Sequence, residues 1–186
     1  MLILASNSPR RKELLNMLGY EFKVKASDCD ENTDLTDPEQ LVKELSLRKA
    51  RAVVCNSDDT VIGSDTVVAI DGKILGKPKD KKDAEDMLKL LSGKTHTVFT
   101  GVTIIKDNTV ITDCVGCDVV FKPLTQDEII GYINTLEPMD KAGAYAIQGK
   151  GSAFVERISG DYFAVVGFPC CYVNQTLNKL GIYPTK

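Results

Sequence analysis

The sequence of 186 residues has one histidine, no long apolar run and no marked excess of charge of either sign. No apolar stretch reaches the roughly 18 to 20 residues that are needed to cross a bilayer. The opening residues Met1-Leu2-Ile3-Leu4-Ala5 are followed at once by polar residues and lack the basic segment of a secretion signal. The net charge of −3 gives no general attraction for nucleic acid. We therefore expect a cytoplasmic protein that binds neither membranes nor nucleic acids and holds any polyanion through a local group of arginines and lysines.

The scarcity of histidine also limits the chemistry. His96 lies at the start of a segment rich in Thr and Val, and no nucleophile motif surrounds it, so we expect no Ser-His or Cys-His catalytic pair. Cys114-Val115-Gly116-Cys117 has the C-x-x-C spacing of a zinc or redox site, but the close second pair of most zinc folds is missing. The surrounding residues 112–121 predict a half-buried strand, in which thiols are ordinary packing groups.

A phosphate-binding P-loop is not expected either. Ser92-Gly93-Lys94-Thr95 has the sequence of the end of a P-loop, but Leu88 stands where the motif requires its first glycine. The segment is also predicted to end a helix, whereas a P-loop opens one. Gly149-Lys150-Gly151-Ser152 precedes a predicted strand and fails for the same reason.

The pattern of apolar residues and turn signals predicts a mixed α/β fold. Helices are predicted from Ser8-Pro9, from Asp37-Pro38, over Lys79–Leu91, from Thr125 and over about Cys171–Leu180. Strands are predicted over Leu2–Ala5, Phe22–Ala26, Val61–Gly63, Val67–Ile70, Thr95–Ile105, Val110–Phe121, Phe154–Ile158 and Phe163–Val166, with hairpin turns at Asp71-Gly72 and Asp107-Asn108. Met139–Gly151 is rich in glycine and predicts a loop. We expect a mixed sheet with helices on its faces, forming two lobes with a ligand cleft between them.

The segment Ser6-Asn7-Ser8-Pro9-Arg10-Arg11 is the first candidate for binding. It places backbone N–H groups at the start of a predicted helix and two guanidinium groups in the first turn. Positive charge there opposes the helix dipole unless an anion is bound. A triphosphate would satisfy the N–H groups and the arginines together. The alternative is a surface helix that tolerates these charges.

Acidic residues supply the second set of candidates. In Gly63-Ser64-Asp65-Thr66-Val67-Val68, an aspartate interrupts an apolar strand, and a buried carboxylate is costly unless it is paired or bound to metal. Asp65 is therefore a metal ligand or general base, or else the capping residue of a turn. The loop Asp28-Cys29-Asp30-Glu31-Asn32 offers the oxygen ligands that Mg²⁺ and Mn²⁺ prefer, although such loops are equally common as solvated surface.

Five blocks of sequence in this order resemble the Maf family of nucleotide pyrophosphatases. The blocks are Ala5-Ser6-Asn7-Ser8-Pro9-Arg10-Arg11-Lys12-Glu13-Leu14-Leu15, Gly63-Ser64-Asp65-Thr66-Val67-Val68, Gly76-Lys77-Pro78, Leu90-Leu91-Ser92-Gly93-Lys94-Thr95-His96 and Asp140-Lys141-Ala142-Gly143-Ala144-Tyr145-Ala146-Ile147-Gln148-Gly149. The resemblance runs from Leu2 to the final helix and implies a single Maf-like domain over residues 1–186. The implied fold is similar to that of the inosine-triphosphate pyrophosphatases, with an elongated mixed β-sheet flanked by helices and two lobes around a central cleft.

The resemblance also implies a reaction, in which water attacks the α-phosphorus of a nucleoside triphosphate with the help of a divalent metal cation, Mg²⁺ or Mn²⁺. The implied roles are proton acceptor for Asp65, metal binding for Glu31 and Asp65, phosphate binding for Ser8, Arg11, Lys49, Lys77 and Lys141, and base preference for Arg10, Thr66 and Gln148. Threonine after the catalytic aspartate resembles the branch that hydrolyses dTTP and UTP, with a house-cleaning role that includes modified pyrimidine triphosphates. Whether Asp65 is base, metal ligand or both stays open, as does the oligomeric state, for which a homodimer is one alternative.

Two other functions compete with this interpretation. A nucleotide-binding regulator of cell division would bind triphosphates without hydrolysing them, and it would not require a general base such as Asp65. An inosine-triphosphate pyrophosphatase would share the fold and prefer deaminated purines, but the Ser-x-Ser-Pro-Arg-Arg pattern of residues 6–11 argues against it.

Overall fold

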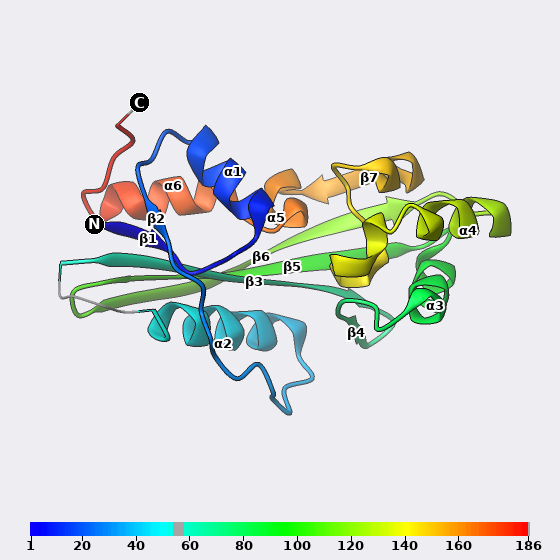
Figure 1. Cartoon of the computed structure of the whole chain (residues 1–186), viewed down its shortest axis with the longest axis horizontal. Helices are drawn as coiled ribbons and strands as arrows, with labels where there is room; N and C mark the ends of the chain where they lie inside the picture. The colour runs from blue at the N-terminus through cyan, green and yellow to red at the C-terminus, as the bar shows by residue number, and fades with distance from the viewer. Residues whose placement is uncertain (54–57, 186) are drawn as a thin grey trace. The chain divides into compact units, whose positions relative to one another are not determined.

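A computed structural model describes residues 1–53 and 58–185. The helices are α1 (Pro9–Met17), α2 (Pro38–Arg51), α3 (Lys81–Leu91), α4 (Gln126–Asn134), α5 (Tyr162–Val166) and α6 (Cys170–Lys179), with short 3-10 helices η1 (Glu137–Asp140), η2 (Ala142–Ala144) and η3 (Lys150–Phe154). The strands are β1 (Leu2–Leu4), β2 (Lys23–Val24), β3 (Thr60–Ile70), β4 (Lys73–Leu75), β5 (Thr95–Lys106), β6 (Thr109–Phe121) and β7 (Val155–Gly160) (Figure 1). The loop predicted over residues 139–151 consists largely of these 3-10 turns.

Over the described residues, the strands form one mixed sheet of seven strands in the order β2-β1-β3-β5-β6-β7, with β4 paired to β3. β1 is parallel to β2 and β3, whereas β4 and β7 are antiparallel to their partners. The predicted mixed α/β fold, with a mixed sheet flanked by helices, is therefore confirmed. None of the helices within the described ranges is both long enough and apolar enough to span a membrane.

The chain divides into two compact units. Unit 1 contains Met1–Asp65, Thr100–Val115 and Gly167–Lys186, and unit 2 contains Thr66–Phe99 and Gly116–Val166. The divisions fall within β3, β5 and β6, so each of these strands contributes residues to both units. In β3 the division lies between Asp65 and Thr66.

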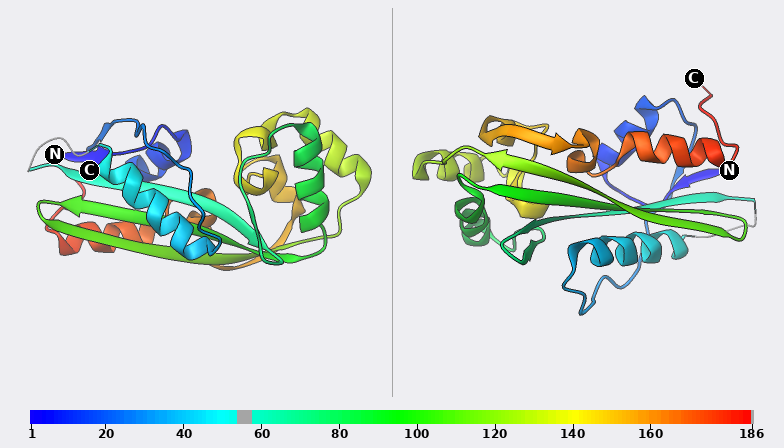
Figure 2. Two further views of the ribbon diagram at one scale, coloured as in Figure 1. Left: turned by 90° about the horizontal axis from the view of Figure 1, so that it is seen from below. Right: turned by 180° about the vertical axis from the view of Figure 1, so that it is seen from behind.

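In unit 1, α2 covers one face of the sheet, and α1 and α6 cover the other (Figures 1 and 2). α2 begins as predicted, with Pro38 in its first turn and the Asp37 side chain accepting a hydrogen bond from the Gln40 N–H at 2.8 Å. Two glycines let α2 approach the strands closely. A Cβ at Gly63 would lie 2.7 Å from the backbone nitrogen of Ala50, and a Cβ at Gly101 would overlap the Val42 carbonyl. The backbone of α2 therefore packs directly on β3 and β5.

In unit 2, α3 and α4 pack against each other and bury their apolar faces. The predicted capping box at Thr125 and Glu128 is confirmed, and α4 begins there. α3 begins two residues later than predicted, because the Asp80 side chain caps it by accepting from the Asp83 N–H at 2.8 Å. The Ser92-Gly93 segment ends α3 as expected of a segment that is not a P-loop, with Gly93 at a φ of 67°.

The single histidine and the C-x-x-C pair lie in strands. His96 is buried in unit 2, shares a 2.8 Å hydrogen bond between Nε2 and the Tyr145 hydroxyl, and packs edge-on against Phe121. Burial lowers the pKa of His96 to about 4. The strand predicted around Cys114 and Cys117 is confirmed as β6, and burial raises the pKa of Cys114 to about 11, so this thiol is protonated at neutral pH.

Four predicted strands differ from the structure. β3 runs without a break from Thr60 to Ile70, so the interruption predicted at Asp65 is wrong. The strand predicted over 163–166 is also wrong, because these residues belong to the short helix α5. Asp161 starts that helix: its side chain accepts from the Phe163 N–H at 2.8 Å, and its carbonyl accepts from Ala164 at 3.1 Å. The strand predicted over 22–26 is shorter, since only Lys23–Val24 pairs with β1.

Candidate active site

Asp65 lies in the middle of β3 with little exposure, and its carboxylate pairs with Lys49 from the last turn of α2. The distance from Lys49 Nζ to Asp65 Oδ1 is 2.5 Å, and each side chain is 12% exposed. The close packing of α2 on Gly63 brings the two elements together. A buried carboxylate is costly without a partner, and the Lys49 ammonium supplies that partner for Asp65. The alternative in which Asp65 caps a turn is wrong, since β3 does not turn there.

Glu31 is the third member of this charged cluster. Its Oε1 lies 3.1 Å from Lys49 Nζ, and its side chain is 59% exposed. The ammonium of Lys49 therefore contacts two carboxylates from distant parts of unit 1, one on a strand and one on a loop. The structure thus brings together three of the residues predicted for the site.

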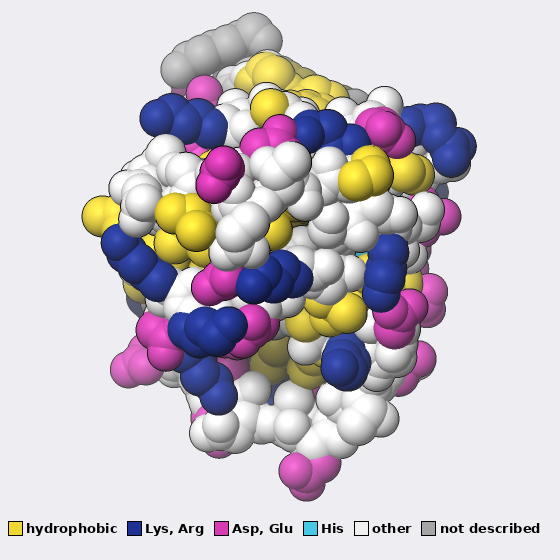
Figure 3. Space-filling model, turned by 90° about the vertical axis from the view of Figure 1, so that its right-hand side faces the viewer, with side chains coloured by type: hydrophobic (Ala, Val, Ile, Leu, Met, Phe, Trp, Pro, Cys, Tyr) yellow, Lys and Arg dark blue, Asp and Glu magenta, His cyan; other side chains and the backbone are white. Residues whose placement is uncertain are grey.

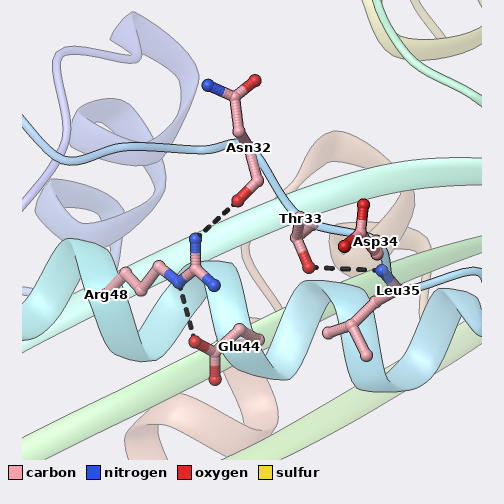
Figure 4. A pocket seen from close by; sticks show the side chains of 6 residues that line it. All are labelled: Asn32, Thr33, Asp34, Leu35, Glu44 and Arg48. Atoms are coloured by element: carbon pink, nitrogen blue, oxygen red, sulfur yellow. Dashed lines mark hydrogen bonds and ion pairs between the residues drawn. The ribbon is translucent and has the colours of Figure 1, made fainter.

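Arg48, next to Lys49 on α2, holds the loop that carries Glu31. Its Nη1 donates to the carbonyl oxygens of Asp30 at 3.1 Å and Asn32 at 2.9 Å, the residues on either side of Glu31. Its Nε donates to Glu44 Oε1 at 2.7 Å, which fixes the guanidinium along the helix (Figure 4). Figure 4 also shows the hollow that this loop forms with α2, lined by Asn32, Thr33, Asp34, Leu35, Glu44 and Arg48. Arg48 is not among the residues predicted for the site, and its only local signal is its i,i+4 spacing from Glu44.

Arg11, in the first turns of α1, is directed toward the backbone next to Asp65. Its Nη1 donates to the Ser64 carbonyl at 2.8 Å, and its Nε donates to the Gly167 carbonyl at 2.9 Å. Burial lowers the pKa of Arg11, and the nearby Asp65 carboxylate partly offsets that effect. Arg11 therefore places a positive charge close to Asp65 and ties α1 to β3. Its predicted role in phosphate binding stays a prediction.

The start of α1 has the features that were predicted for anion binding. Ser8 occupies the N-cap position without a capping bond from its side chain, and the first turn contains no acidic residue. The backbone N–H of Ser8 donates to Ser6 Oγ at 3.2 Å. Arg10 is half-buried, and its charge contributes to lowering the pKa of Arg11. The positive end of the helix dipole and two arginines thus lie together.

Unit 2 brings together two lysines that were predicted to bind phosphate. Lys77 is exposed after β4, and Lys141 lies between η1 and η2. The Gly143 N–H donates to the Gly76 carbonyl at 3.0 Å, which joins the two loops next to these lysines. Gly143 has a φ of 68°, and a Cβ there would lie 2.8 Å from Val68 Cγ2, so only glycine fits. Lys141 itself pairs with the Asp140 carboxylate.

Two of the residues predicted to determine base preference, Gln148 and Thr66, lie in different segments of unit 2. Gln148 is exposed in the segment between η2 and η3, whereas Thr66 is half-buried in β3. Because β3 continues without a break through Asp65 and Thr66, the alternation of a strand directs these two side chains to opposite faces. No bend in β3 turns the two side chains to the same side.

The chain matches the family model described as "Maf-like protein" over residues 1–180. This chain belongs to the Maf family. It is 53% identical over 186 residues to a dTTP/UTP pyrophosphatase of Bacillus pumilus, with 98% of each chain covered. It is 48% identical over 183 residues to a dTTP/UTP pyrophosphatase of Bacillus anthracis, covering 97% of this chain and 96% of that one. The resemblance found in the sequence blocks is confirmed.

A solved structure of another protein supports the fold. A HAM1 protein from Coxiella burnetii superposes with a TM-score of 0.54 at 12% sequence identity, covering 96% of this Maf chain and 98% of that protein. At this identity the similarity concerns the fold alone. It agrees with the expectation of a mixed sheet flanked by helices.

The acidic residues of this Maf chain fit a divalent cation. Asp65 and Glu31 offer carboxylate oxygens, the ligand type that Mg²⁺ and Mn²⁺ prefer, and both already contact one cationic group, the Lys49 ammonium. Among the described residues, no group of three or more His, Cys, Asp or Glu side chains is arranged to hold a metal. Mg²⁺ commonly binds through one or two carboxylates together with water and substrate phosphates, so a pair of carboxylates is sufficient.

Proposed function

We propose that this Maf chain hydrolyses dTTP and UTP to the monophosphate and pyrophosphate. The observation that carries the proposal is the charged cluster of Asp65, Lys49 and Glu31 in a chain that is 53% identical, over 98% of its length, to a protein named dTTP/UTP pyrophosphatase. A protein that only binds nucleotides would not need a carboxylate held in this way. No observation favours the regulator over the hydrolase.

In the proposed mechanism, Asp65 accepts a proton from the attacking water at a carboxylate oxygen. Lys49 holds this carboxylate in place on β3 and places a positive charge beside the reacting groups. Arg11 fixes the backbone at Ser64, directly before Asp65, and adds a second positive charge. These groups are held by the fold before substrate arrives, so they need little reorganisation during the reaction.

The proposal includes a divalent cation, Mg²⁺ or Mn²⁺, held by Asp65 and Glu31. When bound, it would neutralise charge on the phosphates and make pyrophosphate a better leaving group. Ser8 and the start of α1, with Lys77 and Lys141 of unit 2, are proposed as the remaining phosphate-binding groups. We also propose a cytoplasmic location and a role in removing modified pyrimidine triphosphates.

Arg10, Thr66 and Gln148 are proposed to determine base preference. Gln148 carries both a donor and an acceptor, which matches the alternating pattern on the edge of uracil or thymine. On the face of the molecule drawn in Figure 3, lysines and arginines are interspersed with aspartates and glutamates, without a broad area of one charge. That face therefore offers no broad basic area for a nucleic acid.

The test is a screen of nucleoside triphosphates with Mg²⁺ or Mn²⁺, in which pyrophosphate and orthophosphate are measured separately. We expect monophosphate and pyrophosphate, fastest from dTTP and UTP, and no reaction after chelation of the metal. Release of orthophosphate one group at a time, through a diphosphate, would contradict the proposed reaction.

A further inference from the structure

The segment that carries Gln148 is irregular, yet its backbone is tied down at both ends. Residues 146–151 follow η2 and extend into the first two residues of η3, and the Gln148 side chain within them is exposed. An exposed side chain on an irregular segment is usually mobile. A glutamine that distinguishes one base edge from another must instead be held in a defined position.

Glu137, at the start of η1, binds the far end of this segment. Its Oε2 accepts from the Lys150 N–H at 3.1 Å, and its Oε1 accepts from the Gly151 N–H at 3.2 Å and from the Tyr132 hydroxyl at 2.9 Å. Burial raises the pKa of Glu137, but these hydrogen bonds outweigh burial and bring the pKa below its usual value. The carboxylate is therefore charged at neutral pH, and its hydrogen bonds are of the stronger, charge-assisted kind.

Tyr132, on α4, binds the near end. Its hydroxyl accepts from the Ala146 N–H at 3.0 Å while it donates to Glu137. The Tyr132–Glu137 pair thus contacts the backbone two residues before Gln148 and again two and three residues after it.

Two glycines in the segment are required by this pair. A Cβ at Gly149 would lie 2.5 Å from Glu137 Oε2, and a Cβ at Gly151 would lie 2.9 Å from the Tyr132 hydroxyl. Real Cβ atoms do not approach other atoms this closely. A side chain at either position would therefore displace the pair or the segment.

We infer that Tyr132 and Glu137 are positioning residues that determine base preference by fixing the backbone on either side of Gln148. The inference rests on the proposed function, because it requires a triphosphatase that distinguishes bases through Gln148. Neither residue is required to touch the nucleotide. Their removal should therefore weaken discrimination between bases more than it weakens hydrolysis itself.

The experiment measures kcat/KM for UTP and for CTP, whose base edges differ in the order of donors and acceptors. In Glu137→Gln, an amide –NH₂ replaces one of two oxygens that each accept an N–H, so one hydrogen bond becomes a donor–donor contact. We expect the UTP-to-CTP ratio to fall by at least about 5-fold, with kcat/KM for CTP changed by less than about 2-fold. Glu156→Gln, which removes an exposed carboxylate from β7 of the same unit, should leave the ratio unchanged.

A second arm tests whether the pair acts through Gln148. In a Gln148→Ala background, Glu137→Gln should cause no further loss of the ratio, because residues that act in series are not additive. If Glu137→Gln does not fold, as judged by circular dichroism, Tyr132→Phe serves instead. It removes only the hydroxyl and keeps the ring packed against Phe154, whose centroid lies 5.0 Å away.

The outcomes separate this inference from the proposed function. If the unmodified protein hydrolyses no triphosphate, the proposed function fails. If it discriminates between bases but Gln148→Ala leaves the ratio intact, or if Glu137→Gln slows UTP and CTP equally, the inference is overturned and the proposed function stands. Full additivity of Glu137→Gln and Gln148→Ala would also overturn it.

Discussion

Lys49 and Asp65 form an ion pair of 2.5 Å between the last turn of α2 and the middle of β3. Neither side chain is more than 12% exposed, so removing one partner leaves a poorly solvated charge on the other. The same ammonium reaches Glu31 at 3.1 Å. The pair therefore couples the stability of unit 1 to the proposed chemistry, and the first two predictions concern it.

Asp65→Asn should abolish most of the activity without unfolding the protein. Asparagine keeps the size of the side chain but cannot accept a proton from water, so turnover of UTP should fall by about 10²- to 10⁴-fold. Steady-state kinetics and circular dichroism measure the two effects. Turnover close to that of the unmodified protein, in a folded variant, would remove Asp65 from the proposed catalytic role.

Lys49→Met should destabilise the protein as well as slow it. The methionine fills similar space but leaves the Asp65 carboxylate unpaired, which should lower the free energy of unfolding by about 2 kcal/mol. Adding Asp65→Asn to Lys49→Met should restore part of that stability, because the unpaired charge is then gone. Urea denaturation of the two single variants and the double variant measures this. A double variant that is less stable than Lys49→Met would contradict the ion-pair argument.

Gly63→Ala should lower stability through packing alone. The new methyl group would overlap the Ser46 carbonyl and lie 2.7 Å from the Ala50 nitrogen, so α2 must move away from β3. A cost of about 1 to 3 kcal/mol is expected. Gly131→Ala is the matched control, since a Cβ there meets nothing within 4 Å. In the helix α4, that change should raise stability by up to about 1 kcal/mol, and both values follow from thermal or urea unfolding.

Stability should fall in acid because of His96. Its pKa is lowered from 6.5 to about 4 in the folded state, chiefly by burial, so the unfolded chain binds a proton more readily. The contribution of neutral His96 is complete above about pH 6.5 and is lost as the pH falls towards 4, a change of about 3 kcal/mol in total. His96→Gln should show a smaller loss than the unmodified protein between pH 7 and pH 4. Equal losses in the two proteins would show that other groups govern acid unfolding.

Glu31→Gln should raise the concentration of Mg²⁺ or Mn²⁺ needed for half-maximal activity, by about 10-fold or more if Glu31 is a metal ligand, because one of the two carboxylates is lost. Maximal turnover at saturating metal should fall much less than it does in Asp65→Asn. Titration of activity with metal, starting from chelated protein, measures this. An unchanged metal requirement would place Glu31 outside the metal site.

Local signals predicted the parts of the fold that depend on neighbouring residues. The capping box at Thr125, the hairpin at Asp71-Gly72 and the start of α2 at Asp37 were all predicted, because each is stabilised within a few residues. The unbroken course of β3 was not predicted. Its polar side chains have partners that are distant in sequence: Ser64 donates to the Gly167 carbonyl, and Asp65 pairs with Lys49. The local pattern of apolar and polar residues gives no information about such partners.

The residues of the candidate site also fall into two groups, those that the sequence predicted and those that it did not. Asp65, Glu31 and Lys49 were predicted to act together, and the structure places them in contact. Arg48 and Glu137 were missed because each binds backbone N–H or carbonyl groups of a distant loop, and any sequence supplies those groups. Residues that act on the backbone leave no complementary side chain to recognise in a sequence.

The close approaches at Gly63, Gly101 and Gly149 bear on how mutational tolerance is to be interpreted in this chain. Each glycine accommodates a neighbouring carbonyl or carboxylate where a methyl group would overlap it, and none of them is proposed to touch a nucleotide. A saturation screen for activity would therefore score Gly63 and Gly101 as intolerant alongside Asp65, because the atoms that they approach belong to the backbone of α2. A map of intolerant positions would then overestimate the extent of the substrate-binding surface, unless protein abundance is measured in the same screen.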